Sequence, residues 1–530
     1  MRLSLFLLTG CLPPILVDTG LPLASDSGAL DSADSAESVD SADTSDTVDT
    51  ADTGDTNDTS EGIDADSDGH VAASDGGDDC NDSDPNIYPA APEYFDAVDD
   101  DCDTMVSETV INYVHATNTP GAVVGTAVFF ARGLDDALNE VISVGLPGAG
   151  SAMIVAEDDL RTGTADEGSI LVSMTTADTS ANVGYSHLLA DLDGDGLLDW
   201  MVGAPGTRSG DGALYVVEDD AVTLSEHIDL DGLAPVALHS IVADGVLGSP
   251  AIGTAVATLE GNIAVSTLGL TGGGAWLHDV DTVLGATETV VSEGQRIAGD
   301  PADLNLGAAM ISADFSCDGT PGLLISAPSA VGGAVNAGRI YGFLADTINT
   351  GANLTTAQAD LEITGGIKDA YLGGFMLSAS DINDDGCSDY AVMSYAVSGK
   401  DRTVAVLRGA AAIHNIDASS QALALIDEIK QYDASNIPSA AIVDVDGDLR
   451  SDLLVGEPEK QPGEVHLFMS DVLAGGGTLG AESATVTATG PEARDLFGAG
   501  MIGIDDGGHD GLLLSAPNFD DGAIFYVPTR

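Results

Sequence analysis

Three short acidic stretches carry the side chains of this chain that are best suited to chemistry. They run from Asp191 to Asp199, from Asp381 to Asp389 and from Asp444 to Asp452, and each places oxygen-bearing side chains at positions 1, 3, 5 and 9. Calcium takes about six to eight oxygen ligands, so alternating carboxylates on a tight turn suit this hard cation. The spacing therefore predicts three calcium-binding loops.

The expected ligands are the side chains at these four positions, joined in the first loop by a backbone oxygen near Leu197. They are Asp191, Asp193, Asp195 and Asp199; Asp381, Asn383, Asp385 and Asp389; and Asp444, Asp446, Asp448 and Asp452. Without an ion the carboxylates of one turn repel one another, so empty loops should be loose. The alternative is a solvated Asp-Gly turn. Two less regular stretches, 314–322 (with Gly322 at position nine) and 505–510, are left unassigned.

The elements that must position these loops are short strands. From residue 106 onward, β-rich runs alternate with Gly, Asp and Pro turns, and no long segment has a helical period. Seven units align on marker glycines at 125, 184, 253, 307, 374 and 498, which lie 54 to 69 residues apart except for one double step. Such repeats predict an all-β, seven-bladed β-propeller over residues 106–530, whose closure removes exposed sheet edges. A string of β-sandwiches is the alternative, but it does not require Gly-Ala-Pro at a fixed phase.

The second unit shows the repeat most clearly. It contains Val183-Gly184-Tyr185, the acidic loop, Gly203-Ala204-Pro205 and a strand led by Gly212. This pattern resembles the FG-GAP repeat of integrin α-subunit β-propellers. The resemblance implies calcium with a structural role in the blades, and ligands that meet the loops on the opposite face.

The N-terminal part of the chain predicts export. Arg2, a short apolar run and Cys11 resemble a bacterial lipoprotein signal over residues 1–10, with Cys11 as the lipidated residue. Residues 11–61 are rich in Asp, Ser and Thr, and an acidic residue occurs at every third position from Asp31 to Glu61. This segment cannot bury enough apolar surface to fold, so we predict a disordered acidic stalk.

Residues 62–105 form a separate small acidic module. Asp64, Asp66, Asp68 and Asp75 stand at positions 1, 3, 5 and 12 of a segment that resembles an EF-hand loop, although no helical pattern flanks it. The segments Asp79 to Asp82 and Asp100 to Asp103 resemble a MopE-type metal-binding repeat. The resemblance implies a metal-binding module closed by a Cys80–Cys102 disulfide. A unit this short also needs a covalent bridge or a metal to fold.

The cysteines indicate the cellular compartment, and the net charge limits the kinds of partner. Four cysteines besides Cys11 permit two disulfides in an exported chain. Cys80 and Cys102 share one module and are the preferred pair, whereas Cys317 and Cys387 either pair or remain buried thiols. With 15 basic against 87 acidic residues and a formal charge of -72, nucleic acid and anionic lipid surfaces are excluded as partners. We expect a monomer that contacts a membrane only through a lipid anchor.

The sequence contains no catalytic signature that we would assign, so no catalytic residues are predicted. The favoured hypothesis is a non-catalytic, calcium-stabilised binding or adhesion protein at the cell surface or outer membrane, or secreted, with a protein or glycan ligand on a cell or in the matrix. A secreted propeller hydrolase or lyase acting on glycans is the alternative, and a transition-metal scavenger built on residues 64–103 is a third. Trp200, Trp276 and Tyr185 are candidate sugar-stacking residues, with packing inside the blades as the favoured role.

Overall fold

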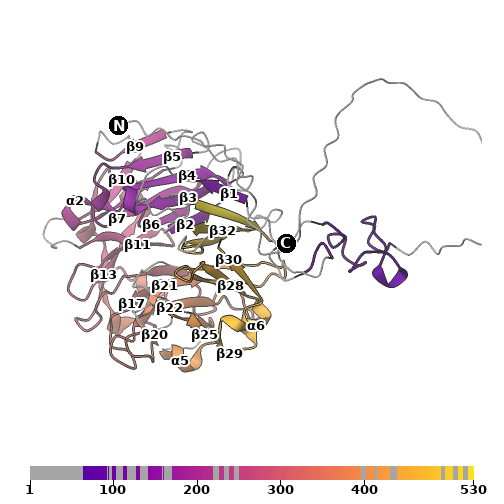
Figure 1. The fold of residues 1–530 in the computed structure, drawn as a ribbon. Helices are drawn as coiled ribbons and strands as arrows, with labels where there is room; N and C mark the ends of the chain where they lie inside the picture. The colour runs from indigo at the N-terminus through magenta and orange to yellow at the C-terminus, as the bar shows by residue number, and fades with distance from the viewer. Residues whose placement is uncertain are drawn as a thin grey trace, which may run out of the picture. The chain divides into compact units, whose positions relative to one another are not determined.

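The computed structural model describes two compact units, a small acidic module of residues 64–91 and 99–102 and a large β unit that contains all the strands (Figure 1). The described residues are 64–91, 94, 98–102, 112–115, 127–131, 141–157, 159, 170–218, 226–231, 238–243, 250–394, 402–410, 415–429, 439–490, 496–504, 511–516 and 523–529. The expected signal and stalk, with Cys11, lie outside them. Among the described residues, no helix is long and apolar enough to cross a membrane.

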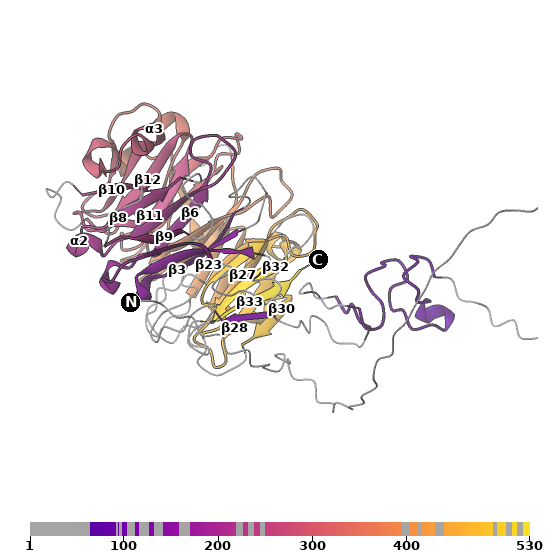
Figure 2. The ribbon, with the colours of Figure 1, turned by 90° about the horizontal axis from the view of Figure 1, so that it is seen from above.

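The large unit is a β-propeller of seven sheets whose main strands are antiparallel, which confirms the predicted fold class. Each blade has four main strands, and the blades follow one another along the chain (Figures 1 and 2). Blades 1 to 3 are β2 (Ala127–Ala131), β3 (Val141–Leu146), β4 (Ser151–Ala156), β5 (Ile170–Thr175); β6 (Ser186–Ala190), β7 (Asp199–Ala204), β8 (Ala213–Val217), β10 (Leu238–Val242); and β11 (Ile252–Leu259), β12 (Asn262–Thr267), β13 (Gly274–Asp279), β15 (Gln295–Ala298).

Blades 4 to 6 repeat this arrangement. They are β16 (Met310–Ala313), β17 (Gly322–Ala327), β18 (Arg339–Phe343), β20 (Leu361–Thr364); β21 (Leu372–Ser378), β22 (Tyr390–Ser394), β23 (Arg402–Leu407), β25 (Ala424–Ile429); and β26 (Ala440–Val443), β27 (Asp452–Glu457), β28 (Glu464–Phe468), β30 (Val486–Thr489). The repeated strand order means that equivalent hairpins of successive blades emerge at the same end of the propeller.

Blade 7 closes the ring by using a strand from the other end of the unit. Its first three strands are β31 (Met501–Ile504), β32 (Gly511–Ala516) and β33 (Ala523–Pro528), and the fourth is β1 (Asn112–His115). β1 runs antiparallel to β33, with Asn112 opposite Tyr526 and His115 opposite Ala523. The first described strand of the propeller therefore completes its last blade, so the ring is held shut by backbone hydrogen bonds.

Five blades carry a fifth, parallel edge strand that comes from the following blade. These strands are β9 (Glu226–Asp229), β14 (Thr289–Val290), β19 (Leu354–Thr355), β24 (Asn415–Asp417) and β29 (Gly477–Leu479). Short helices occupy the turns: η1 (Ala73–Asp75), η2 (Pro147–Ala149), η4 (Thr179–Ala181), α2 (Thr207–Gly210), α3 (Val280–Leu284), η6 (Val291–Glu293), α4 (Ala345–Ile348), η7 (Thr356–Gln358), α5 (Ala418–Gln421), α6 (Ser470–Ala474) and η8 (Ala481–Ser483). The fifth strands cover outer edges and tie neighbouring blades together.

The marker glycines are required where adjacent blades touch. Gly253 has a φ of +83°, and a Cβ there would lie 2.4 Å from the Ala213 oxygen and 3.0 Å from the Gly203 Cα. Gly203 is the glycine of the Gly-Ala-Pro segment, so the two halves of the repeat meet across the boundary between blades 2 and 3. In blade 5 the positive-φ residue is Gly373, not the Gly374 chosen from sequence, because buried Leu372 takes the preceding apolar position.

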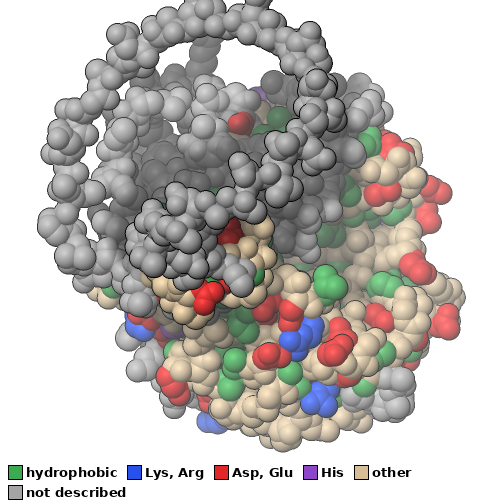
Figure 3. Space-filling model, turned by 90° about the vertical axis from the view of Figure 1, so that its right-hand side faces the viewer, with side chains coloured by type: hydrophobic (Ala, Val, Ile, Leu, Met, Phe, Trp, Pro, Cys, Tyr) green, Lys and Arg blue, Asp and Glu red, His purple; other side chains and the backbone are tan. Residues whose placement is uncertain are grey.

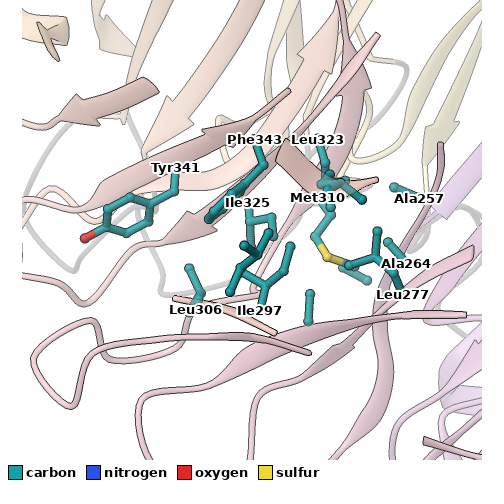
Figure 4. Close-up of a cluster of buried hydrophobic side chains, with 14 of the residues drawn as sticks. Ala257, Ala264, Leu277, Ile297, Leu306, Met310, Leu323, Ile325, Tyr341 and Phe343 are labelled. Carbon is teal, nitrogen blue, oxygen red and sulfur yellow. The ribbon is translucent and has the colours of Figure 1, made fainter. Parts of the chain in front are cut away.

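The core is divided among the blade boundaries. Seven clusters of buried apolar side chains are found among the described residues, one for each pair of neighbouring blades, including blades 7 and 1. Figure 4 shows the cluster between blades 3 and 4, where Leu277 and Ile297 face Met310, Ile325 and Phe343.

On the face drawn in Figure 3, acidic side chains are spread among polar and apolar ones, and basic ones are few.

Candidate metal centres

The acidic loops occupy the same place in their blades, the hairpin between the first and second main strands. Residues 191–198 join β6 to β7, 379–389 join β21 to β22, and 444–451 join β26 to β27. The incomplete stretch at 314–321 joins β16 to β17. In blade 3 this hairpin is a tight turn at Glu260 and Gly261, and the 505–510 stretch lies outside the described residues.

The three full loops share one backbone fold, which their own carboxylates organise. The first Asp accepts a hydrogen bond from the N–H of the sixth residue, at 3.0 Å for Asp191, 2.6 Å for Asp381 and 2.7 Å for Asp444. The fifth residue likewise accepts from the N–H of the seventh, at 2.8, 3.1 and 2.8 Å for Asp195, Asp385 and Asp448. Alternating Asp residues therefore form successive side-chain-to-backbone turns.

The ninth residue lies beneath each loop. Asp199, Asp389 and Asp452 are almost fully buried, and each accepts a hydrogen bond from the N–H of the second loop residue at 2.8, 3.0 and 2.8 Å. Burial raises the pKa of Asp389 to about 6, although the N–H of Ile382 and the amide of Asn383 oppose the shift. Burial raises the pKa of Asp452 to about 7. A partly desolvated carboxylate next to others favours either a proton or a bound cation.

The exposed carboxylates of the blade 2 loop converge. One oxygen each from Asp191, Asp193 and Asp195 lies within 4.8 Å of the other two. Three negative charges at this separation repel one another unless a cation lies among them. The Leu197 N–H donates to Asp195, which turns that part of the backbone around the carboxylates. The donor set consists of hard oxygens and fits Ca²⁺.

The blade 6 loop differs because it contains its own cation. The Arg450 guanidinium donates to Asp448 through Nε at 2.8 Å and also reaches Asp471 at 2.8 Å. Desolvation raises the pKa of Asp446, and the charges of Asp448 and Asp444 raise it further. Arg450 thus neutralises part of the charge that a metal ion would otherwise neutralise.

The loops of blades 4, 5 and 6 are joined side by side. A disulfide links Cys317 in the blade 4 loop to Cys387 in the blade 5 loop, with Cα atoms 5.1 Å apart. On its other side the blade 5 loop is joined to blade 6, because the Ser451 Oγ lies 2.5 Å from the Ser380 Oγ and accepts from the Ser380 N–H at 3.1 Å. The blade 4 loop keeps the shared fold, with Asp314 accepting from the Gly319 N–H at 2.8 Å.

In the small module Asp64, Asp66 and Asp68 of the predicted loop lie close to Asp79 and Asp82, which the loop spacing did not indicate. One group of mutually close oxygens comes from Asp66, Asp68 and Asp79, and another from Asp64, Asp66 and Asp82. Asp75, the expected twelfth-position ligand, is exposed at the end of η1 and belongs to neither group. Asp79 comes close to Asp66 and Asp68 because a short bridge pairs Ala72 with Asp79 and folds the chain back.

The sequence contained a signal for these two aspartates. Asp79 and Asp82 belong to the Asp-Cys-Asn-Asp segment that resembles the MopE-type repeat, but spacing alone did not connect them to residues 64–68. The neighbouring cysteines form a disulfide, Cys80–Cys102, with a Cα separation of 5.7 Å. The His70 Nδ1 lies 3.2 Å from an Asp78 oxygen, and the His70 ring stacks on Tyr88.

The candidate sugar-stacking tryptophans lie inside the blades. Trp200 is fully buried, and its indole N–H donates to the Ser143 Oγ at 2.9 Å. Trp276 is buried under the Arg296 guanidinium, which lies 5.6 Å from the ring centre. Of the three aromatic residues singled out in the sequence, Tyr185 is the exposed one.

One cluster of titratable residues was not recognised in the sequence. In blade 6, Glu457, Glu464 and His466 bring ligand atoms within 4.8 Å of one another. Lys460 contacts both glutamates. Burial lowers the pKa of Lys460, but the hydrogen bond to Glu464 and the charges of the two glutamates outweigh this and raise it. A lysine ammonium therefore lies where a metal would otherwise balance the charge.

Comparison with known proteins gives two separate matches, one to a family model and one to full-length relatives. Residues 79–108 match a family model of the copper-binding MopE type, described as a "Putative metal-binding motif". Phosphatidylinositol-glycan-specific phospholipase D is similar to part of the chain: the Bos taurus protein is 27% identical over 220 residues, which are 38% of this chain and 25% of the relative. The Rattus norvegicus protein is 30% identical over 209 residues, 36% of this chain and 24% of the relative. The chain thus spans about a quarter of the length of these relatives.

Proposed function

We propose that this protein is an exported, calcium-stabilised β-propeller that binds a protein or glycan ligand and has no catalytic activity. The observation that carries the proposal is the loop fold shared by blades 2, 5 and 6, in which carboxylates at positions 1 and 5 organise the backbone and a ninth carboxylate is buried beneath. Binding of Ca²⁺ at these loops stabilises the blades and fixes the hairpins at one end of the ring.

Two features of the described structure support binding at a cell surface or in the matrix. The closed ring holds its inter-blade loops on a rigid scaffold, as adhesion surfaces require. The two disulfides are of the kind that persists in oxidising compartments outside the cytosol. The proposal also includes the acidic stalk and the lipid at Cys11 that the sequence predicts, and a monomeric state.

The test of the calcium assignment is thermal melting of the full chain in calcium, in magnesium and in excess chelator. A ligand that binds only the native state stabilises it by about 2.7 kcal/mol per site at a hundredfold excess over its Kd. We expect calcium, and not magnesium, to raise the Tm of the propeller transition. An unchanged Tm would mean that the loops are solvated turns and would refute the metal part of the proposal.

The test of binding uses the immobilised full chain with panels of matrix proteins and glycans, in calcium and in chelator. The expected result is saturable capture of one ligand class that is lost in chelator. A chain that is stabilised by calcium but captures no member of either panel would contradict the adhesion role alone.

A second candidate is an enzyme that acts on glycans or on a glycosylated lipid anchor. The distant similarity to phosphatidylinositol-glycan-specific phospholipase D favours it, together with the buried Glu457–His466 contact of 3.2 Å. Incubation with glycans and with an anchored protein tests it, using Glu457→Gln and, as the matched control, the exposed Glu482→Gln. Turnover lost only in Glu457→Gln would replace the binding proposal with this one.

A further inference from the structure

Three carboxylates of the small module each leave one oxygen without a hydrogen bond. The Oδ1 atoms of Asp66, Asp68 and Asp79 accept from backbone N–H groups at 3.3, 2.7 and 2.8 Å. Their Oδ2 atoms are buried, and no donor among the described residues reaches them. The Asp79 side chain is the most enclosed, since the residue is only 1% exposed.

These three carboxylates face one another. Asp66, Asp68 and Asp79 bring ligand oxygens within 4.8 Å. An ionised carboxylate is costly to bury without a partner, and three together add mutual repulsion. From this geometry we propose that Asp66, Asp68 and Asp79 bind one hard divalent cation of the Ca²⁺ class, with Asp64 and Asp82 beside it.

The donor set selects a hard cation over copper or zinc. Both cysteines of the module are oxidised to the Cys80–Cys102 disulfide and offer no thiolate. The His70 ring is in contact with Asp78 and stacked on Tyr88, and it belongs to neither aspartate group. Imidazole and thiolate suit copper and zinc, whereas carboxylates from a flexible loop suit Ca²⁺.

The site joins the matched motif to residues that precede it in the chain. Asp79 is the first residue of the matched motif at 79–108, whereas Asp66 and Asp68 precede it. The cation therefore fastens the 64–68 loop to the disulfide-bonded segment. Among the described residues of the module, the buried apolar side chains are only Ala72, Ile87 and Ala91, too few for a self-sufficient core.

The experiment counts calcium bound to the full chain by equilibrium dialysis, comparing wild type with Asp79→Asn and Asp68→Asn. The matched control is Asp75→Asn, which removes the ligand indicated by the EF-hand spacing but lies outside the cluster. Asp79→Asn and Asp68→Asn should each lose one equivalent, and Asp75→Asn none. A competing dialysis with Cu²⁺ should leave that equivalent in place. Because only the difference between variants is read, the result does not depend on the blade loops.

A second measurement separates ligation from folding. In chelator, Asp79→Asn relieves repulsion, so residues 64–102 should be cleaved by proteinase K more slowly than in wild type; in calcium the order should reverse. Unchanged calcium counts in both variants would overturn the site. Loss of the equivalent in Asp75→Asn would restore the EF-hand arrangement, and displacement by Cu²⁺ would overturn the hard-cation assignment.

Discussion

The propeller and the small module both present aspartates at close spacing, but different forces hold them together. The propeller has an apolar cluster at every blade boundary, and each fully buried Leu or Phe contributes about 1.5–3 kcal/mol. The ninth-position carboxylates of its loops have backbone donors. Among its described residues, the module has three small or medium buried apolar side chains and carboxylate oxygens that no described donor reaches.

The difference teaches where a cation matters for folding. We expect an ion in the propeller to add stability to a ring that apolar packing assembles. In the module we expect a cation, together with the disulfide, to supply stability that the few buried apolar side chains of its described residues do not. On this proposal the same residue type at similar spacing serves rigidity in one unit and folding in the other.

Removing the disulfides should give the largest difference in behaviour between the two units. Cys80→Ser with Cys102→Ser should abolish the order of the module in chelator. Cys317→Ser with Cys387→Ser opens a link between residues 70 apart and should lower the propeller stability by about 4 kcal/mol while leaving it folded. Proteolysis of the module and the urea midpoint of the propeller report the two effects. A module that resists protease without its disulfide would break the comparison.

Acid should weaken the propeller through a buried histidine. His187 donates from Nε2 to the Gly184 oxygen at 2.8 Å and accepts at Nδ1 from the Ser143 hydroxyl at 2.8 Å, so its neutral form is satisfied. Burial lowers its pKa from 6.5 to about 4. The unfolded chain then takes up the proton first. The stability is therefore complete above pH 6.5 and is lost as the pH falls towards 4.

The expected loss in this pH window is about 3 kcal/mol, and His187→Gln should flatten it. Urea unfolding at several pH values measures the slope. The control is Trp200→Phe, which removes the indole donor to Ser143 and should lower the stability at every pH without changing the slope. An equal slope in wild type and His187→Gln would assign the acid sensitivity to other groups.

Repetition explains how much of the fold was predictable. Each blade needs a close backbone contact with its neighbour, so the glycines at 203 and 253 recur at a fixed phase and reveal the blades. The pairing of β1 with β33 and the five edge strands involve partners distant in sequence, and no local pattern marks them. In blade 5 the sequence indicated Gly374 in place of Gly373, because two adjacent glycines satisfy the same pattern.

The candidate sites were predictable only where their side chains are close in sequence. Positions 1, 3, 5 and 9 of the blade loops lie on one hairpin, so spacing indicated them as candidate ligands. Asp79 comes close to Asp66 and Asp68 through a chain reversal at η1, which the EF-hand spacing did not indicate. The Cys317–Cys387 bridge was left open because it depends on which loops of adjacent blades face each other.

Arg450 allows the blade loops themselves to be compared. Because its guanidinium neutralises Asp448, Arg450→Gln should lower the stability in chelator by about 1 kcal/mol and tighten calcium binding at the blade 6 loop. Calcium titration monitored by thermal melting gives the sign of the change in stability and the sign of the change in calcium affinity. The blade 2 loop, where Leu197 stands at the same position, serves as the internal reference. A loss of calcium affinity would show that Arg450 organises the loop rather than competing with the ion.

The smallest expected effect concerns the contact between loops. Ser451→Ala removes the hydroxyl that binds the Ser380 hydroxyl and N–H, and it should cost about 1 kcal/mol. A double-mutant cycle with Ser380→Ala isolates the pair, because the two hydroxyls contact each other across the blade boundary. If the loops of blades 5 and 6 act together, Ser451→Ala should also weaken the calcium response of an Asp452→Asn variant, whose remaining full loop in this pair is in blade 5. Additive effects would mean that each hairpin responds to calcium on its own.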